Sequence, residues 1–362
     1  QIDPSFGTTE DLRELVQEAH KRGMKIVMDA VFNHTGREFF AFEDIMEKGE
    51  KSKYLDWYYI EKFPLESERG EIPNYKCFGY YGGMPKLNLK NPEVEKFFTD
   101  VACYWIKECD IDGWRMDVGD EISHYFWKNF RRAVKAVKKD MLIIGEIWHY
   151  AGDFLEGDEW DTVMNYPFYL NLIDLLADEK INVSQFIQNL GYLKGRLNKK
   201  CYPLMWNLID SHDTARFLHL CNDNKKKQHL AAAFQLLLPG MPMIYYGDEF
   251  AMPGANDPDC RRGMYWDEEY QDKEMFEWYK QLLKVRKNHA CIVEGEPIEI
   301  AARDEEETIV LTRKNGEETL ALIFNCSSSA RMFNEYAQKY DLLRENPFDG
   351  KIEGLDAAVI VL

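Results

Sequence analysis

The sequence is poor in basic residues relative to acidic ones. It holds 45 lysines and arginines against 63 aspartates and glutamates, which gives a formal net charge of −18. Binding to nucleic acid or to an anionic membrane favours a basic protein surface, so we expect no nucleic-acid partner. The sequence also lacks an apolar run approaching the ~18 residues of a membrane-spanning helix, and we expect no membrane partner either.

Cysteine spacings typical of disulfide frameworks or redox motifs are also missing. The eight cysteines are scattered without a Cys-x-x-Cys pair. Disulfide frameworks belong mainly to small secreted chains, and this chain has 362 residues. Its first residues, Gln1-Ile2-Asp3-Pro4, are not a signal peptide and are typical of the middle of a protein. We therefore expect reduced thiols and a cytoplasmic protein.

Motifs that hold metals or phosphates are absent from the sequence as well. There is no His-Glu-x-x-His, and no glycine-rich loop follows a predicted strand. We therefore predict no bound metal and no cofactor, and the sequence does not support a calcium site.

What the sequence does contain is a regular alternation of helices and strands. Thr8 lies three residues before Asp11, the spacing of a capping box, and apolar residues then recur at helical period as far as Gly23. Asn91-Pro92 begins another helix, with asparagine as N-cap and proline at the first helical position. Further helices are predicted near 123–139, 183–193, 225–238 and 273–288, and strands at 25–32, 111–117, 141–146, 161–165, 204–209 and 243–246. Such alternation is typical of βα units around a parallel sheet.

The number of predicted strands indicates a barrel that is incomplete in this chain. Six barrel strands follow Gln1, whereas a closed barrel of this kind has eight. The predicted fold is therefore α/β, a (β/α)₈ TIM-type barrel that lacks its first two strands in this chain, and we expect those strands to precede Gln1.

Two segments interrupt the alternation. Residues 35–90 far exceed the ~2–6 residues of an ordinary βα loop, and their aromatics, glycines and prolines indicate a small inserted domain. From about Cys291 the pattern changes to strands, with Asn315-Gly316 as a strong hairpin signal and Ala357–Leu362 as a last strand. The predicted domains are 1–34 and 91–290 for the barrel, 35–90 for the insert and 291–362 for a C-terminal β-sandwich.

Four short segments place chemically active side chains at the ends of predicted strands. Hydrolysis of a glycosidic bond needs two carboxyl groups on opposite sides of one bond, and a parallel barrel brings side chains from several strand ends to one mouth. A single aspartate at a strand end is usually a helix cap or a turn former. Four such segments in the same order along one chain are much harder to explain as caps and turns alone. They are Asp29–His34, Gly113–Val118, Gly145–Trp148 and Ser211–Asp213.

The surroundings of the carboxylates indicate their division of labour. Arg115 and Asp117 point to the same side of one strand, so we expect the arginine to lower the pKa of Asp117, which suits a nucleophile. Glu146 ends an apolar run that disfavours a charged carboxyl, which suits a general acid. Asp213, after His212, could stabilise positive charge in an oxocarbenium-like transition state.

These four segments resemble the conserved regions of the α-amylase family of retaining glycoside hydrolases. The resemblance covers nearly the whole chain. Met84-Pro85-Lys86-Leu87-Asn88 narrows it, because this segment is similar to the marker of the neopullulanase, cyclomaltodextrinase and maltogenic amylase subgroup. Tyr246–Glu249 and Asp257–Arg262 fit the same subgroup.

The resemblance implies a role for each site residue. Asp117 would be the nucleophile, Glu146 the acid/base and Asp213 the transition-state stabiliser, with the carboxyls of the first two about 5–5.5 Å apart. Around them the resemblance implies substrate contacts from His34, Arg115 and His212 at the cleaved bond, Trp148 near the leaving-group sugar, Asp257 and Arg261 at the next sugar on the non-reducing side, and Glu121 toward an acceptor, with Asp29 and Asn33 as structural support.

One departure from the subgroup affects the outcome of the reaction. After Asp117 the subgroup usually has Val-Ala-Asn-Glu, and this chain has Val118-Gly119-Asp120-Glu121. The balance between hydrolysis and transglycosylation therefore stays open, and the family's calcium geometry is not carried over. The subgroup's N-terminal domain supports dimerisation, so the resemblance implies a homodimer for the full-length protein.

The leading hypothesis is a hydrolase of α-1,4 and, as an option, α-1,6 glucosidic bonds in cyclodextrins, pullulan and malto-oligosaccharides. An oligo-1,6-glucosidase is a close alternative. Two readings from another class are a non-catalytic binding or scaffold member of the fold and an inactive fragment, since a six-stranded remnant would leave two sheet edges unpaired.

Overall fold

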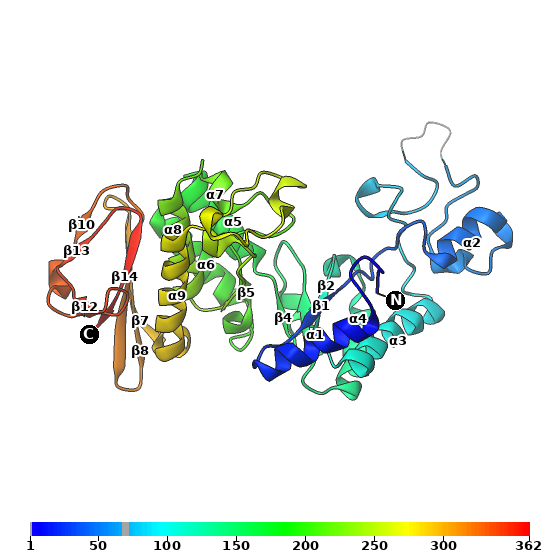
Figure 1. Ribbon diagram of the computed structural model, residues 1–362, viewed down its shortest axis with the longest axis horizontal. Coiled ribbons are helices and arrows are strands. Elements are labelled where there is room, and N and C mark those ends of the chain that lie inside the picture. Colours follow the sequence, from blue (N-terminus) through cyan, green and yellow to red (C-terminus); the bar gives the residue numbers. More distant parts are fainter. Residues whose placement is uncertain (1, 67–71) are drawn as a thin grey trace. The chain divides into compact units, whose positions relative to one another are not determined.

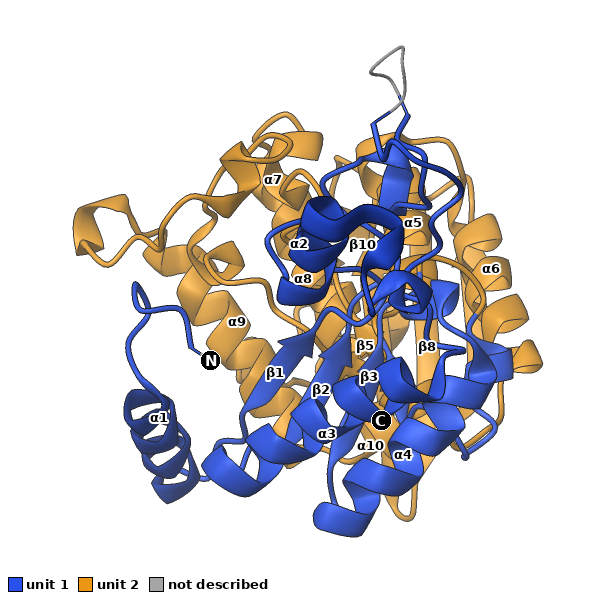
Figure 2. Cartoon of the chain, turned by 90° about the vertical axis from the view of Figure 1, so that its right-hand side faces the viewer, with its two compact units in different colours: residues 1–147, 151–163 blue, residues 148–150, 164–362 orange. Residues whose placement is uncertain are grey.

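The computed structural model describes residues 2–66 and 72–362. The chain forms two compact units, one of residues 1–147 and 151–163 and the other of residues 148–150 and 164–362 (Figure 2). They are called the first and the second unit below. Among the described residues, no helix is long and apolar enough to cross a membrane.

The first unit is built on a four-stranded parallel sheet with the strand order β1-β2-β3-β4. Figure 1 labels β1, β2 and β4 of this sheet. Helices alternate with these strands along the chain, as the sequence predicts. The elements are α1 (Thr9–Lys21), β1 (Val27–Ala30), α2 (Phe40–Lys48), η1 (Gly49–Lys51), η2 (Leu55–Trp57), η3 (Phe78–Tyr80), α3 (Pro92–Cys109), β2 (Gly113–Met116), η4 (Gly119–Glu121), α4 (His124–Val137), β3 (Leu142–Gly145), η5 (Gly152–Phe154) and β4 (Thr162–Val163).

The predicted helix starts of this unit are confirmed in atomic detail. The Thr8 side chain accepts a hydrogen bond from the backbone of Asp11, whose carboxylate in turn accepts one from the Thr8 backbone. Asn91 caps α3 and is followed by Pro92 in the first turn. Both devices satisfy backbone N–H groups that a helix start leaves without an intrahelical partner.

Aromatic packing fixes the sheet of the first unit against its helices. The Phe32 ring lies 5.4 Å from Phe98 of α3 and 5.9 Å from Phe130 of α4. On β3, a Cβ atom at Gly145 would lie 2.2 Å from the Trp160 ring, so only glycine lets this indole cover the strand end. Because Glu146 follows directly, this contact also fixes where the next side chain begins.

The second unit combines helices, a short parallel strand pair and a C-terminal antiparallel sheet. Its elements are α5 (Tyr166–Leu172), η6, a π-helix (Ile173–Ala177), α6 (Val183–Arg196), η7 (Tyr202–Leu204), β5 (Trp206–Asn207), α7 (Phe217–Leu220), α8 (Lys225–Leu237), β6 (Met241–Pro242), η8 (Asp248–Phe250), η9 (Asp259–Arg261), η10 (Glu268–Tyr270), α9 (Lys273–Asn288), α10 (Cys291–Glu294), β7 (Glu296–Arg303), β8 (Thr308–Asn315), β9 (Glu318–Asn325), β10 (Arg331–Met332), η11 (Asn334–Tyr336), β11 (Tyr340–Asp341), β12 (Asn346–Pro347), β13 (Lys351–Ile352) and β14 (Asp356–Val361).

The C-terminal sheet has six strands in the order β12-β11-β14-β9-β8-β7, and β10 pairs with β13 beside it. The hairpin predicted at Asn315-Gly316 joins β8 to β9, and Gly316 has the positive φ of 60° that such a tight turn needs. The last predicted strand is β14, which pairs with β9. A C-terminal antiparallel sheet is thus confirmed, while the predicted bounds of the four domains stay a prediction.

The strand predicted at Met243–Tyr246 is wrong in position. The structure places β6 at Met241–Pro242, paired in parallel with β5. One further contact follows, in which the Met243 N–H donates to the Asn207 carbonyl. Tyr245 and Tyr246 then leave the strand because their rings pack against the Arg216 guanidinium, at 4.4 and 5.0 Å.

Candidate active site

The predicted site residues divide between the two units. In the first unit, the registers of β1, β2 and β3 place Asp29 opposite Arg115, and Arg115 opposite Ile144. Asp117 follows β2 directly and Glu146 follows β3. Parallel strands end at one edge of their sheet, so these side chains meet there.

Arg115 gathers three carboxylates on one guanidinium. Its Nη1 lies 2.9 Å from Asp29 Oδ1 and 2.9 Å from Asp117 Oδ1, and its Nη2 lies 2.9 Å from Glu146 Oε2. Below, these four residues are called the Arg115 cluster. The predicted bracing of Arg115 by Asp29 is part of it, and the two carboxylates with proposed catalytic roles are bound to the two prongs of one planar fork.

The cluster carries more negative than positive charge, and this determines the ionisation of its members. Burial lowers the pKa of Arg115, but Asp29, Glu146 and Asp117 outweigh it and raise the pKa above the ordinary value. For Asp117, burial has a larger effect on the pKa than the neighbouring charge of Arg115. Burial raises its pKa, and the nearby Glu146 adds to this, so that Arg115 does not compensate. Arg115 lowers the pKa of Asp117, as the sequence predicts, but the expected net lowering is wrong, because burial and a second carboxylate raise this pKa by more.

Glu146 is held by the backbone as well as by Arg115. Its side chain is 7% exposed, and its Oε2 accepts a hydrogen bond of 3.0 Å from the Val118 N–H. Val118 has a φ of 46°, in the left-handed region that a β-branched residue rarely adopts. This strained turn aims the N–H at Glu146, and strain of this kind is typical of functional sites.

A second group of predicted residues lies around Lys86 in the same unit. Lys86 Nζ lies 2.7 Å from Glu121 Oε2 and also donates to Asn33 Oδ1. Asn33 donates to Glu121 over 3.3 Å. His34 stacks on Phe78 with ring centroids 5.1 Å apart, and burial lowers its pKa, with a smaller contribution from Lys86. Lys86 is a residue that the sequence argument did not assign, although it lies in the subgroup marker Met84–Asn88.

The remaining charged residues of the predicted site meet in the second unit. His212 Nε2 lies 3.2 Å from Asp213 Oδ2, and Arg261 Nη2 lies 3.3 Å from Asp213 Oδ1. Arg261 also binds Asp257 through a contact of 2.9 Å. These ion pairs bring together four predicted site residues of the second unit, namely His212, Asp213, Asp257 and Arg261.

A buried network supports the loop that carries His212 and Asp213. Arg216 is 0% exposed, donates to the Tyr246 carbonyl over 2.9 Å and contacts Asp248 at 3.2 Å. Asp210 accepts the Phe217 N–H over 2.7 Å. Burial raises the pKa of both Asp210 and Asp248, and the nearby Asp210 raises the pKa of Asp248 further. The sequence argument missed this network; its signal was an arginine within the otherwise apolar run 215–218.

Trp148 is the aromatic member of the predicted site. Its ring stacks on Tyr166 at 3.9 Å with an interplanar angle of 14°, and it remains 40% exposed. A fixed, exposed indole of this kind can cover one face of a sugar ring. Among the described residues, no group of three or more histidines, cysteines, aspartates or glutamates is arranged to hold a metal ion.

This arrangement can be compared with known proteins. Residues 1–271 match the family described as Alpha amylase, catalytic domain. The chain belongs to the α-amylase family.

Three curated relatives in this family have closely related names. The cyclomaltodextrinase of Geobacillus thermopakistaniensis is 45% identical over 330 residues, which are 91% of this chain and 56% of the relative. Neopullulanase 2 of Thermoactinomyces vulgaris is 47% identical over 81% of this chain and 50% of its own length. The maltogenic α-amylase of Bacillus acidopullulyticus is 41% identical over 94% and 58%. The chain therefore spans about half to three fifths of the length of these relatives.

Solved structures of similar proteins agree with the fold. A cyclomaltodextrinase superposes with a TM-score of 0.94 at 37% identity, covering 99% of this chain and 64% of that protein. The cyclic α-maltosyl-(1→6)-maltose hydrolase of Arthrobacter globiformis gives a TM-score of 0.88 at 33% identity, covering 98% and 79%. The resemblance inferred from the four segments is thus confirmed at the level of family and subgroup, while the role of each site residue stays a prediction.

Proposed function

We propose that the protein is a retaining glycoside hydrolase that cleaves α-glucosidic bonds in cyclodextrins, pullulan and malto-oligosaccharides. The observation that carries the proposal is the Arg115 cluster, in which Asp117 and Glu146 lie on the two prongs of one guanidinium. The printed names of the relatives, at 41–47% identity, support the substrate class. Transglycosylation to a sugar acceptor remains an option for the same intermediate.

In the proposed mechanism, the two carboxylates act on opposite sides of the anomeric carbon. Glu146 gives its proton to the glycosidic oxygen while the ionised Asp117 forms a bond to that carbon, and the bond to the leaving sugar breaks. Water then gives a proton to Glu146 and its oxygen to the anomeric carbon, which releases Asp117. Two inversions give net retention. Asp213 stabilises the positive charge that develops on the sugar.

The surrounding residues orient the sugar. Arg115, His34 and His212 are proposed to contact its hydroxyl groups, and Asp257 and Arg261 the next sugar on the non-reducing side. Trp148 covers the leaving-group sugar and Glu121 faces an acceptor, while Asp29 and Asn33 hold their neighbours in place. The ion pairs of Arg261 with Asp213 and Asp257 support this grouping, since they link three of these residues directly.

We also propose the finer architecture that the family implies. The strands β1 to β6 would belong to a (β/α)₈ barrel, supported by the parallel pairing of β1 to β4 and of β5 with β6. The proposed domains remain 1–34 with 91–290, 35–90 and 291–362. A homodimer of the full-length protein and a cytoplasmic location are further proposals. The cytoplasmic location is supported by a relative from Bacillus subtilis that is named intracellular maltogenic amylase and is 42% identical to this chain.

The direct test is the release of reducing sugar from β-cyclodextrin, pullulan and starch. Removing either proposed catalytic carboxyl, as Asp117→Asn or Glu146→Gln, should lower kcat by at least roughly 10³-fold, since each acts in the bond-breaking step. Asp100→Asn, which removes a surface partner of Lys96 on α3, is the matched control and should leave kcat unchanged. Full activity of either cluster variant would overturn the proposal, and a strong preference for long starch over cyclodextrin would overturn the substrate class.

A further inference from the structure

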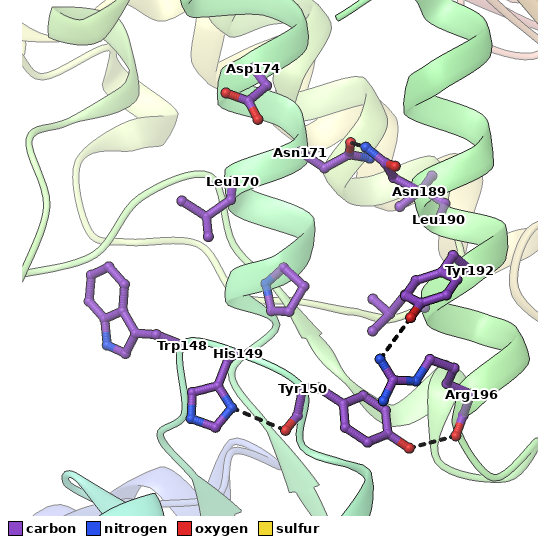
Figure 3. Close-up of a pocket in the computed structure, with 12 residues that line it drawn as sticks. Trp148, His149, Tyr150, Leu170, Asn171, Asp174, Asn189, Leu190, Tyr192 and Arg196 are labelled. Carbon is purple, nitrogen blue, oxygen red and sulfur yellow. Dashed lines mark hydrogen bonds between the residues drawn. The ribbon is translucent and has the colours of Figure 1, made fainter.

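A cavity of about 410 Å³ lies in the second unit, between α5, α6 and the segment that holds Trp148 and Tyr150 (Figure 3). Small-molecule sites commonly measure about 300–1,000 Å³, so this cavity is large enough for a ligand of one or two sugar rings. None of the residue roles above accounts for it, apart from that of Trp148 at its rim. The cavity is therefore open to a ligand that these roles do not include.

Exposed aromatic side chains form one part of this cavity. Tyr192 on α6 is 66% exposed and Trp148 is 40% exposed, so both rings are accessible to a ligand. Both are held in place. Trp148 stacks on Tyr166, and the Tyr192 hydroxyl accepts a hydrogen bond of 3.0 Å from Arg196.

Arg196 extends this ordering to the third aromatic ring. Its guanidinium lies 4.0 Å above the Tyr150 ring, and its backbone carbonyl accepts a hydrogen bond of 2.7 Å from the Tyr150 hydroxyl. Figure 3 shows Tyr150, Tyr192 and Arg196 in this arrangement at one end of the cavity. A surface ordered before binding does not lose its freedom when a ligand arrives, which favours affinity.

Amides and a carboxylate form the other part of the cavity. The Asn171 side chain donates to the Phe186 carbonyl over 3.0 Å and accepts a hydrogen bond of 2.8 Å from Asn189. Asn171 thereby holds Asn189 in position at the rim (Figure 3). Asp174 is partly exposed, and its ion pair with Lys180 is long, at 3.6 Å. An amide offers both donors and acceptors, and a carboxylate offers acceptors.

This combination identifies the chemical class of the ligand. Flat aromatic faces suit the apolar C–H faces of a pyranose, and amide and carboxylate groups suit its ring of hydroxyls. Asp174 and the net charge of −18 oppose an anionic ligand, and the Arg196 guanidinium is already engaged by the Tyr150 and Tyr192 rings. We propose that this cavity is a further saccharide-binding site, which holds one or two glucose units of an α-glucan chain. The choice of an α-glucan rests on the proposed function.

The position of Trp148 in the chain gives this site its place in the reaction. Trp148 follows Glu146, the proposed acid/base, by two residues. A glucan whose leaving-group sugar contacts Trp148 would continue into the cavity with its next sugars. The site would then add affinity for longer chains without taking part in the cleavage of the bond.

The proposal is tested by binding of maltoheptaose to the Glu146→Gln protein, measured by titration calorimetry. Adding Tyr192→Ala or Asn189→Ala should weaken binding roughly tenfold, the equivalent of about 1.4 kcal/mol, while Tyr192→Phe, which keeps the ring, should bind nearly as the parent does. Tyr125→Ala is the matched control, because Tyr125 is a helical tyrosine that is 67% exposed and lies outside the cavity. Circular dichroism melts of all variants establish that they are folded.

The outcomes separate this inference from the function on which it rests. If the unmodified protein cleaves β-cyclodextrin but the Tyr192→Ala and Asn189→Ala variants bind maltoheptaose as tightly as Tyr125→Ala does, the saccharide site is wrong and the function stands. If the unmodified protein does not bind maltoheptaose and does not cleave β-cyclodextrin, pullulan or starch, the proposed function fails. The assignment of the cavity to an α-glucan then fails with it. Tenfold weaker binding confined to the cavity variants supports both.

Discussion

At the scale of single residues, the most informative feature is the excess of carboxylates over cations around Arg115. One guanidinium contacts three carboxylates, from Asp29, Asp117 and Glu146. Burial raises the pKa of Asp117, although Arg115 opposes the shift. Ionising the nucleophile that we propose therefore costs stability in the folded protein, which is a common feature of active sites.

This cost gives a prediction for Asp117→Asn with a definite dependence on pH. A carboxyl whose pKa is raised in the folded state stabilises the fold most below its unfolded value, ordinarily 3.8, and loses that contribution as the pH rises through the folded value. Asparagine removes the charge and the repulsion by Glu146. We expect the inactive Asp117→Asn variant to have a higher melting temperature than the parent at neutral pH.

The comparison is made by thermal unfolding between pH 3.5 and pH 8, a range chosen to bracket the ordinary value of 3.8. The difference in melting temperature should shrink as the pH falls toward that value, because Asp117 is protonated in the folded protein before it is fully protonated in the unfolded chain, and the charge that asparagine removes is then absent from the folded state. Asp100→Asn serves as the surface control and should show no such difference. A stability loss for Asp117→Asn at neutral pH would mean that the ion pair with Arg115 outweighs burial.

At the scale of elements, the loop between β5 and α7 depends on the buried Arg216 network. Arg216 and Asp248 are 0% and 1% exposed and contact each other at 3.2 Å. Arg216 also ties the loop to the segment after β6 through its hydrogen bond to the Tyr246 carbonyl. Because His212 and Asp213 lie on this loop, their positions depend on a contact that touches no substrate.

The variant Arg216→Met should lower the free energy of unfolding by about 3–5 kcal/mol, since it leaves a buried acidic group without its cation. Combining it with Asp248→Asn should restore part of the loss. The measurement is denaturant unfolding, with Arg132→Met on the exposed face of α4 as a control that should change stability by less than about 0.5 kcal/mol. A loss no greater than that of the control would show that Asp248 is protonated and needs no partner.

The positions of the helices and strands could be predicted from the sequence only in part. The starts of helices with a side-chain cap, such as α1 and α3, could be predicted closely, because capping depends on neighbours in the chain. The sixth strand was misplaced, because Met243–Tyr246 has the apolar pattern of a strand but its tyrosines pack on Arg216. That contact joins distant parts of the chain and leaves no periodic signal.

At the scale of the whole molecule, the family and its subgroup could be predicted from short segments, and the comparisons confirm both. Asp117 and Glu146 could be singled out because each directly follows a strand of the parallel sheet, and their catalytic roles stay a prediction. Lys86 and the Arg216 network could not be found in this way, since their importance comes from burial and from partners far along the chain. The direction of the Asp117 pKa shift failed for the same reason.

The central claim, that Asp117 and Glu146 form a retaining pair, is tested most directly by the anomer that is released first. Proton NMR during the first minutes of β-cyclodextrin or maltoheptaose cleavage distinguishes the α-anomer from the β-anomer before they equilibrate. A retaining pair of carboxyls acts through a covalent intermediate, so the account predicts the α-anomer. Initial release of the β-anomer would contradict it, because water would then attack the sugar directly and Asp117 would not be the nucleophile.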